Sequence, residues 1–504
     1  MDLEKTYQKL RAWGKKRQTL SSILALLEWD QETHMPSSAT EFRAEQIALM
    51  AELSHKLKSA SSFKKQLSYL IDLESGEILA PSLTSSQKAA LTEWRKDLIK
   101  ALKLPSSFVA NFAKTTSSSV AIWQEAKKEN NFKKFAPSLE KIVSLCQKQA
   151  TLLGFKKHPY DALLDLYEPE CSVSTLLPLF DSLKASLSSL LKKHQGRSFP
   201  ETSFLKGYFP KEKQKEAAFI ILKMLGFSKE NSSLDESAHP FCSGIHPLDS
   251  RMTTHIHEDN LMPNLFSVLH EAGHALYNQG LNIEEFGSPL GEQRSLGIDE
   301  SQSRLWETII GKSKSFWIYF YPHLQALFQD TLGSVPLEDF YNALHVVKPS
   351  FIRIDSDETS YCLHIILRFE IELGLIEGSL QVKDIPEIWR EKMKSYLGIS
   401  PSTDREGCLQ DIHWAMGSIG YFPTYALGNL YAAQFFDTFI KQHPTWDKNL
   451  QEGDTTPLRK WLKSHIHSKG REFSAHDLVR NVTGHPLSEK YFLDHLTSNT
   501  IGNK

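Results

Sequence analysis

The sequence has few cysteines, and none of them is spaced for a known cysteine site. Its 504 residues include 5 cysteines, which form no CxxC pair and lie far apart: Cys146, Cys171, Cys242, Cys362 and Cys408. An odd, scattered set argues against a disulfide framework or a cysteine zinc site and fits a reducing cytoplasm. We expect all five thiols to be buried and inert, with a lone nucleophilic cysteine as the alternative.

Long apolar runs and an excess of one charge are also missing. No run of about 18 apolar residues could span a membrane, and the first residues lack the apolar core of a secretory signal. The 58 Lys and Arg residues nearly balance the 60 Asp and Glu residues, which leaves a net charge of −2. Nucleic acids and anionic membranes usually require a basic partner surface. We therefore expect a cytoplasmic globular protein that binds neither.

Strand-like alternation is scarce, and the helical period dominates. Leu3, Tyr7, Leu10 and Trp13 begin one such pattern. Similar patterns recur at 89–102, 137–153, 176–191, 214–225, 316–332, 361–375 and 432–441. One short extended piece is expected at 251–257, which contains β-favouring threonines. Helix-breaking segments are expected at 81–86, 117–119, 197–210 and 232–247.

The chain shows neither a flexible linker nor an internal repeat nor a low-complexity tract. Length alone would favour several domains. We nevertheless expect residues 1–504 to form a single large, mostly α-helical domain, either undivided or in two lobes around a central groove.

The strongest chemical signal is the motif HExxH at His270–His274. Pro263 suits the first turn of a helix and Gly280 its end. Within that helix the two histidines lie on one face, so both can bind one metal ion. The alternative is a buried helix with two hydrogen-bonded histidines, because chance gives this motif in roughly one protein in twenty of this kind.

The residues around the two histidines fit hydrolysis. Glu271 is rotated by about 100° from His270 and would lie beside the ion, where it can accept a proton from water. Ala272 and Gly273 are small, which would let a substrate backbone approach closely. An apolar stripe would bury the helix and keep the site dry: Leu265, Leu269, Ala272 and Leu276.

A catalytic zinc ion takes three protein ligands and leaves one position for water. The candidate third ligand is Glu300, 26 residues after His274, on a second helix. That helix has apolar residues for packing: Ile298, Leu305, Trp306 and Ile309. Arg304 would orient Glu300 or pair with Glu307. Asp299 is the rival ligand, and a solvated surface charge is the alternative interpretation of Glu300.

An ordered set of motifs resembles the carboxypeptidase Taq family of metallocarboxypeptidases over nearly the whole length. Each motif alone is weak, whereas the set in this order is specific. It comprises Trp29–Pro36, His239-Pro-Phe241, DxRxT at Asp249–Thr253, HExxH, Glu300-Ser-Gln302, an IRxxAD-like segment at Ile352–Asp357, GxxQDxHW at Gly407–Trp414, and Gly420–Asn429.

The resemblance implies a cytoplasmic, homodimeric zinc carboxypeptidase with one ion per chain, which also accepts cobalt and binds peptides in a deep groove. It also implies that Glu300 is the third ligand. Two positions depart from the family pattern: Asp299 where histidine is usual, and Ser356 where alanine is usual. We expect neither to touch a ligand, but a negative charge beside the metal would alter metal affinity or the pH optimum. Activity is expected to be retained.

The expected chemistry is metal-assisted peptide hydrolysis, with Glu271 taking a proton from the attacking water and passing it to the leaving amine. The oxyanion needs further donors, for which His413 and one of two tyrosines are candidates. Of the two we favour Tyr425 over Tyr421. Helical-peptidase relatives of the family use a histidine and a tyrosine in that order, with a different spacing. Tyrosines that merely pack a turn are the alternative.

A carboxypeptidase must bind a free carboxylate, and the planar fork of arginine suits that role. The candidates are Arg353, which we favour, and Arg251. A structural salt bridge is the alternative for each, to Asp357 and Asp249 respectively.

Two further groups are candidates near the substrate. His239 would shape the groove, or belong to a turn in which Phe241 packs. Gln410, together with Asp411, would orient His413 or a ligand histidine.

The sequence thus predicts a zinc carboxypeptidase of broad specificity that acts on peptides, since no cluster indicates a charged side-chain pocket. An oligopeptidase or endopeptidase on a similar body is one alternative. A catalytically inactive binding protein is the other, although the intact motif argues against it.

Overall fold

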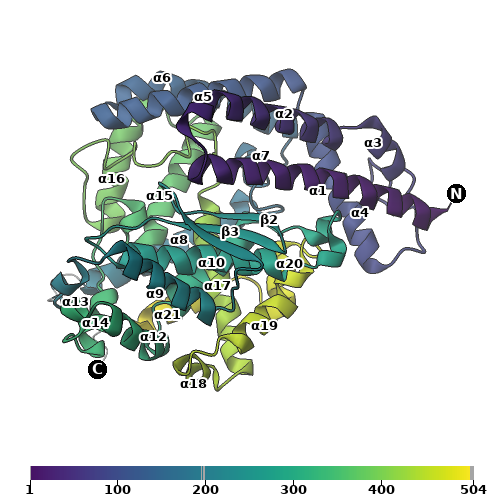
Figure 1. The fold of residues 1–504 in the computed structure, drawn as a ribbon. Coiled ribbons are helices and arrows are strands. Elements are labelled where there is room, and N and C mark those ends of the chain that lie inside the picture. Colours follow the sequence, from purple (N-terminus) through teal and green to yellow (C-terminus); the bar gives the residue numbers. More distant parts are fainter. Residues whose placement is uncertain (1, 195, 197–198, 500–504) are drawn as a thin grey trace.

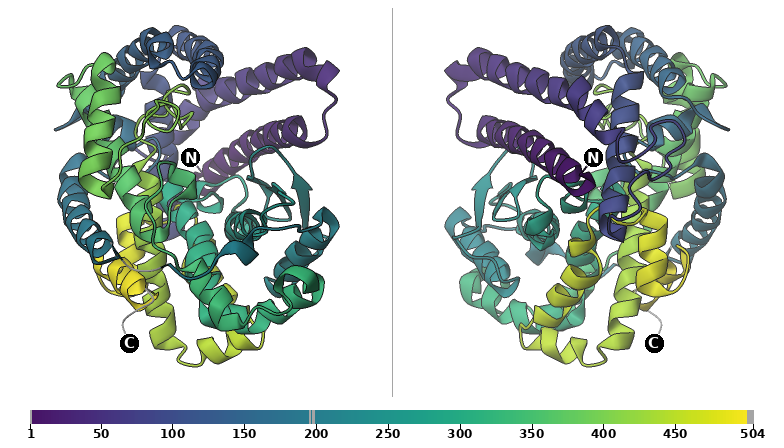
Figure 2. Two further views of the ribbon diagram at one scale, coloured as in Figure 1. Left: turned by 90° about the vertical axis from the view of Figure 1, so that its left-hand side faces the viewer. Right: turned by 90° about the vertical axis from the view of Figure 1, so that its right-hand side faces the viewer.

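A computed structural model describes residues 2–194, 196 and 199–499. The chain begins with a long helical hairpin, α1 (Leu3–Thr33) and α2 (Thr40–Lys58), followed by α3 (Ser61–Leu67) and α4 (Ser85–Lys103). The hairpin extends from the rest of the molecule in the side views (Figure 2). Tyr7, Leu10, Phe63 and Trp94 help to form a small apolar core here, separate from the main core.

Five helices follow: α5 (Ser106–Glu129), α6 (Phe132–Leu153), α7 (Pro159–Leu164), α8 (Val173–His194) and α9 (Lys211–Met224). The prediction of a break at 117–119 is wrong, because α5 runs through it. The hydroxyls of Thr115, Thr116 and Ser118 donate to the carbonyl four residues earlier, so they are satisfied inside the helix. Trp123 and Ala126 bury the end of α5.

The sheet is larger than expected (Figure 1). It contains β1 (Ser232–Glu236), β2 (Cys242–His246) and β3 (Asp249–Thr254) in the order β1-β3-β2, with β1 parallel and β2 antiparallel to β3. The extended piece predicted at 251–257 is therefore β3, shifted toward the N-terminus. The break predicted at 232–247 holds two strands. Its serines, glycine and prolines are poor strand formers, and pairing with β3 overrides that preference.

The central layer consists of α10 (Met262–Gly280), α11 (Leu296–Arg304) and α17 (Pro423–Gln442). Two glycines let these helices pack closely. A Cβ on Gly273 would lie 2.4 Å from the Gln302 carbonyl oxygen of α11, and a Cβ on Gly428 of α17 would lie 2.5 Å from Glu300 Cγ. The expectation that Gly273 gives room to a substrate is therefore wrong, since it gives room to α11.

The remaining elements surround this layer. Residues Leu305–Ile310 form a π-helix after α11. The other helices are α12 (Lys314–Leu327), α13 (Gln329–Leu332), α14 (Leu337–Leu344), α15 (Glu358–Glu377), α16 (Ile385–Leu397), α18 (Trp446–Gln451), α19 (Thr456–His465), α20 (Ala475–Thr483) and α21 (Lys490–Asn499). Of these, α15 is buried along most of its length. The helix predicted at 316–332 is broken at Phe328, and the one predicted at 432–441 begins nine residues earlier, at Pro423.

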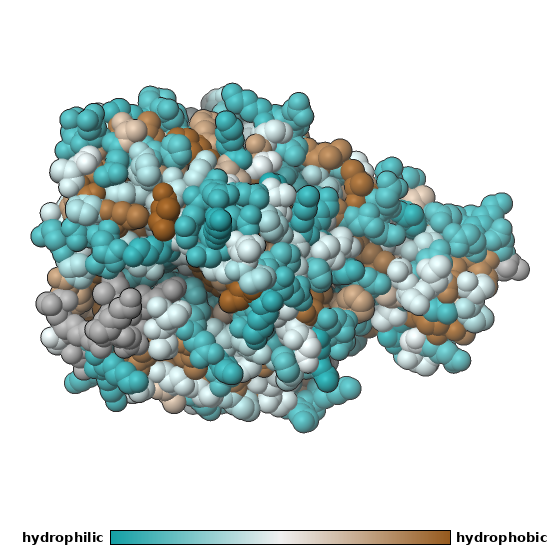
Figure 3. Space-filling model, turned by 90° about the horizontal axis from the view of Figure 1, so that it is seen from below, coloured by the Kyte–Doolittle hydropathy of each residue, from teal (hydrophilic) through white to brown (hydrophobic). Residues whose placement is uncertain are grey.

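The outer surface resembles that of an ordinary globular protein. On the face seen from below, hydrophilic side chains predominate and hydrophobic ones are scattered among them (Figure 3). Among the described residues, no helix combines the length and apolarity needed to cross a bilayer.

The buried histidine His364 on α15 makes stability depend on pH. Burial, with the nearby Arg368 cation, lowers its pKa to about 3, while an unfolded histidine titrates near pH 6.5. Below pH 6.5 this histidine binds a proton in the unfolded chain but not in the folded chain. Its effect on the free energy of unfolding is therefore absent above pH 6.5, and the free energy of unfolding falls as the pH drops toward 3. At pH 5 the protonation of His364 in the unfolded chain should lower the free energy of unfolding by about 2 kcal/mol.

Urea unfolding at pH 7 and pH 5 measures this effect. His364→Gln should lose less stability between the two pH values than the unaltered chain, whereas the exposed-site control His476→Gln should lose the same amount. An identical pH dependence in all three would contradict the assignment.

Candidate active site

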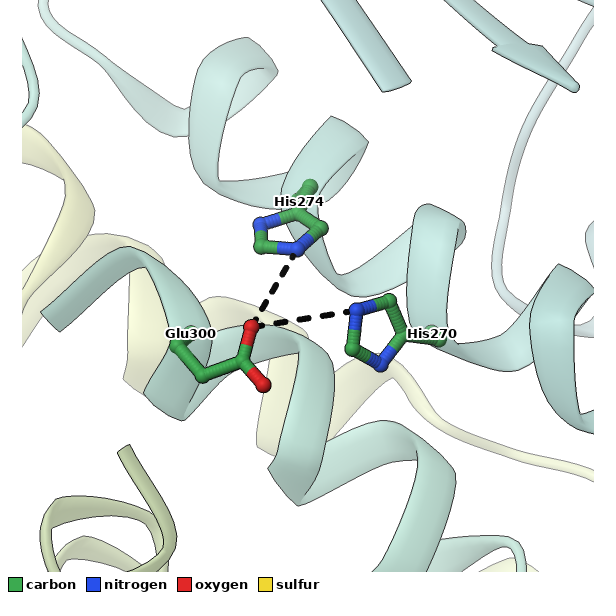
Figure 4. Close-up of side chains that lie close together, drawn as sticks. All are labelled: His270, His274 and Glu300. Atoms are coloured by element: carbon green, nitrogen blue, oxygen red, sulfur yellow. Dashed lines mark ion pairs between the residues drawn. The ribbon is translucent and has the colours of Figure 1, made fainter. Parts of the chain in front are cut away.

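Three side chains from α10 and α11 converge on one point (Figure 4). The ligand atoms of His270, His274 and Glu300 all lie within 4.8 Å of one another. Glu300 Oε2 is 3.8 Å from His270 Nε2 and 3.7 Å from His274 Nε2. These separations are too long for hydrogen bonds and leave space for an ion among two imidazole nitrogens and a carboxylate oxygen, a donor set that suits zinc.

The far nitrogen of each imidazole faces a second carboxylate. His270 Nδ1 is 2.8 Å from Glu307 Oε2, which also accepts a hydrogen bond from Arg304 Nη1 at 2.7 Å. His274 Nδ1 lies 3.0 Å from Asp299 Oδ1, close but not aligned as a hydrogen bond. The expectation that Asp299 touches no ligand is therefore wrong, because it contacts a ligand histidine from behind. It is absent from the group of three converging ligands.

The surroundings of the two imidazoles favour a bound cation. Burial alone would lower the pKa of His274, but the neighbouring carboxylates, first among them Asp299, raise it to about 10. The pKa of His270 is also raised, against the effect of burial, by Glu300 and Glu307. The protein has therefore placed more negative charge here than the two histidines balance, and a divalent ion would neutralise it.

Glu271 lies beside the group of ligands, on the wall of the same pocket. That pocket has a volume of about 360 Å³ and is also lined by Phe241, Cys242, Thr424 and Tyr425. Burial raises the pKa of Glu271, although the two histidines oppose the shift. A buried carboxylate at this place is a suitable proton acceptor for an attacking water.

Two tyrosines and a histidine lie across the pocket from α10. Tyr421 and Tyr425 line the pocket, and Tyr425 Oη is 3.1 Å from His413 Nε2. Burial lowers the pKa of His413 to about 4, so its imidazole is neutral at pH 7. The structure thus brings the three predicted oxyanion candidates together.

Arg353 is buried directly behind these aromatic residues. Its Nη2 donates to Asp411 Oδ1 at 2.8 Å and its Nη1 to Tyr361 Oη at 3.1 Å, and its guanidinium lies 4.9 Å from the Tyr425 ring centre. A structural salt bridge, the alternative interpretation, is thus present, but its partner is Asp411 and not Asp357, which caps α15.

None of the candidates for binding substrate, Arg353 included, lines the pocket. Gln410 uses its amide to accept from Arg353 N and to donate to backbone carbonyls, first among them Glu406 O at 2.9 Å, so it fixes loops. Arg251 forms the alternative salt bridge, to Asp249 at 3.0 Å, and lies over Trp29. His239 is exposed, whereas Phe241 reaches the pocket wall.

The prediction that all five cysteines are buried is wrong for two of them. Cys171 and Cys242 are partly exposed, and Cys242 lines the metal pocket.

The pocket shares two wall residues, Gln293 and Leu296, with a neighbouring cavity of about 580 Å³ under the N-terminal helices. The two cavities therefore adjoin, and each has the size of a small-ligand site.

Two buried acids near the site were missed. Glu168 and Glu372 support loops that carry site residues. Each lies two residues from another glutamate, Glu170 and Glu370 respectively, and no spacing distinguishes the buried acid from its neighbour. Ser356, at one of the two unusual positions, donates to Ile352 O at 3.0 Å and so is satisfied within its own loop.

A helical histidine pair, a carboxylate on the next helix and a buried glutamate beside them define a metallopeptidase. Comparison with known proteins gives the class more closely. The model of the carboxypeptidase Taq (M32) metallopeptidase family matches residues 9–500, and the chain belongs to this family.

Curated and solved relatives agree with this assignment. The chain is 38% identical to thermostable carboxypeptidase 1 of Thermus thermophilus over 98% of both chains, and 36% identical to carboxypeptidase 1 of Bacillus subtilis over 95% of this chain and 94% of that one. The crystal structure of an M32 carboxypeptidase from Deinococcus radiodurans superposes with a TM-score of 0.95 at 32% identity, over 98% and 99% of the two chains. The protein is therefore a metallocarboxypeptidase, and the predicted helical fold is confirmed.

Replacing Glu307 should weaken metal binding without abolishing it. In Glu307→Gln the partner of His270 Nδ1 loses its negative charge, and such changes typically cost about 10- to 100-fold in metal affinity. Competition with a chromophoric chelator measures the constant. Glu338→Gln, which alters an exposed ion pair with Lys314, is the control, and equal affinities in both variants would contradict the role of Glu307.

Proposed function

We propose that this metallocarboxypeptidase is a zinc enzyme with one ion per chain, for which cobalt can substitute, and that it removes C-terminal residues from peptides with broad specificity. The observation that carries this proposal is the convergence of His270, His274 and Glu300 with Glu271 beside them. Bound zinc would lower the pKa of water toward about 7 and polarise the scissile carbonyl.

The chain's own groups supply the proton transfers. Glu271 takes the proton of the attacking water and later delivers it to the leaving amine. Its burial supports the first of these steps, because a carboxylate with a raised pKa accepts a proton from water more readily than an ordinary one.

Tyr425, paired with His413, is the proposed donor to the developing oxyanion, with Tyr421 as its neighbour in the same wall. The tyrosine hydroxyls keep their protons because burial raises the pKa of Tyr421 to about 12 and that of Tyr425 further. A neutral His413 can accept from or donate to Tyr425 without adding charge. These three groups are therefore suited to hydrogen bonding rather than to acid–base exchange.

Arg353 remains the proposed partner of the substrate's terminal carboxylate. Its guanidinium lies over the ring of Tyr425, one of the oxyanion candidates, whereas Arg251 is paired with Asp249 and stacked on Trp29. Its pairing with Asp411 means that a substrate must compete with, or reach past, that salt bridge. His239 and Gln410 are assigned to shaping the groove and its loops.

A pair of peptides that differ only at the C-terminus tests carboxypeptidase action. The free acid should lose its last residue at least about 100-fold faster than the C-terminal amide, because two charge-assisted hydrogen bonds to arginine are lost with the carboxylate. Mass spectrometry of the products measures both rates. Equal cleavage of the amide, or internal cuts, would indicate an endopeptidase instead.

We further propose that the enzyme is a cytoplasmic homodimer with peptides as its partners. The family resemblance and the absence of a disulfide among the described cysteines support this. Light scattering of the purified chain gives the oligomeric state directly.

A further inference from the structure

Two carboxylates lie buried beneath the active site and take no part in the proposed reaction. Glu168 is 1% exposed and Glu372 is fully buried. Each is held by hydrogen bonds from two or more elements, and neither lines the metal pocket. A buried acid with this many donors is costly unless every bond is made, so its position is strongly determined.

Glu168 lies at the start of α11, the helix that carries Glu300. Its Oε2 accepts from Gly297 N at 2.9 Å, and its Oε1 accepts from Tyr431 Oη of α17 at 3.1 Å. It also bonds the side chain of Ser295, the N-cap of α11. A carboxylate is the group that the free N–H donors of a helix start prefer.

These contacts fix α11 against α17. Leu296 N donates to Tyr167 O at 3.0 Å, directly before Glu168. One turn later Glu300 packs on Gly428 of α17, where even one added methyl group would clash. The direction of the Glu300 side chain therefore depends on how α11 sits on α17, and Glu168 bonds to both helices.

Glu372 has a comparable place under the opposite wall. On α15, it accepts from Trp414 Nε1 at 2.9 Å, Gly420 N at 3.0 Å and Tyr160 Oη at 2.6 Å. Trp414 directly follows His413, and Gly420 directly precedes Tyr421. Glu372 therefore supports the oxyanion candidates, and its hydrogen bonds go to Tyr160, Trp414 and Gly420 rather than to the described residues of α10 or α11.

We propose that Glu168 is a positioning residue for the metal ligand Glu300, holding α11 in the register on α17 that aims the carboxylate at His270 and His274. The inference rests on the proposed metal site but not on the proposed hydrolysis. Glu372 positions His413 and Tyr421 in the same way, so the two acids support separate halves of the active site.

Cobalt binding separates the two roles. Glu168→Gln and Glu372→Gln are made in the full chain, freed of metal, and titrated with Co²⁺ against a competing chelator. Glutamine cannot accept from all the donors around Glu168, so we expect Co²⁺ affinity to fall by about 10- to 100-fold, as for other groups that orient ligands, with altered visible absorption bands of the bound cobalt. Glu372→Gln should bind Co²⁺ within about twofold of the unaltered chain.

Several outcomes would overturn the proposal: unaltered Co²⁺ affinity in Glu168→Gln, an equal loss in both variants, or no cobalt binding by the unaltered chain. Circular dichroism of the metal-free proteins establishes whether they fold. If Glu168→Gln does not fold, Gly297→Ala decides, since its Cβ would lie 2.5 Å from Glu168 Oε2 and displace the carboxylate. Tight cobalt binding without peptide hydrolysis would refute the proposed function and leave Glu168's role intact.

Discussion

Glu271→Gln should retain its metal and lose peptide hydrolysis. Glu271 is absent from the converging ligand group, so the substitution leaves all three ligands in place, whereas glutamine cannot accept the proton of the attacking water. General-base catalysis contributes about 10²- to 10⁴-fold, and we expect kcat/KM to fall by that factor with KM little changed. Metal analysis and steady-state kinetics on one preparation measure both quantities.

The control for this experiment is Glu284→Gln, which neutralises an exposed acid shortly after α10. It should keep both metal and activity. Full activity in Glu271→Gln would remove this residue from the mechanism, and loss of metal in that variant would show that it belongs to the ligands.

His270→Ala should lose metal and activity together. Removing one of three ligands leaves two, and the remaining carboxylates Glu300 and Glu307 then face a cavity instead of an imidazole. We expect metal content to fall from about one ion per chain to background after dialysis against chelator, since a catalytic zinc needs three protein ligands. Elemental analysis of the purified protein provides the measurement.

An exposed histidine on α20 supplies the matched control. His476→Ala makes the same change in composition far from the pocket and should keep its metal. A His270→Ala protein that retained one tightly bound ion would mean that the ion is bound elsewhere.

The metal helix was predictable because its signals are local. Pro263 and Gly280 mark its ends, and α10 runs from Met262 to Gly280 as the sequence indicates. The sequence alone left Glu300 and Asp299 as candidates for the third ligand, and the family resemblance favoured Glu300. The structure places Glu300 with the two histidines. The helical class and the family are likewise confirmed. That residues 1–504 form a single domain stays a prediction.

What the sequence could not reveal depends on contacts between distant segments. The strands β1 and β2 form only because β3 pairs with both. Gly273 serves the packing of α11, a purpose that spacing alone cannot distinguish from access for a substrate. Arg353 has Asp411 as its partner, 58 residues away, rather than the nearby Asp357.

The roles of Glu168 and Glu372 also depend on contacts between distant segments, so the sequence could not reveal them. Glu168 and Glu372 hold their loops through backbone amides and aromatic hydroxyls that are more than 40 residues away in the chain. The apolar residues around Glu372 indicate a buried helix, but they do not show which groups its carboxyl would bind. Only the folded arrangement shows that each lies beneath one wall of the site.

A crystal structure of the zinc-loaded protein, with data collected at the zinc absorption edge, tests the site most directly. One anomalous peak per chain should lie about 2.0–2.2 Å from His270 Nε2, His274 Nε2 and a carboxylate oxygen of Glu300. A peak elsewhere, or a Glu300 side chain turned away from the two histidines, would contradict the metal site on which the mechanism depends.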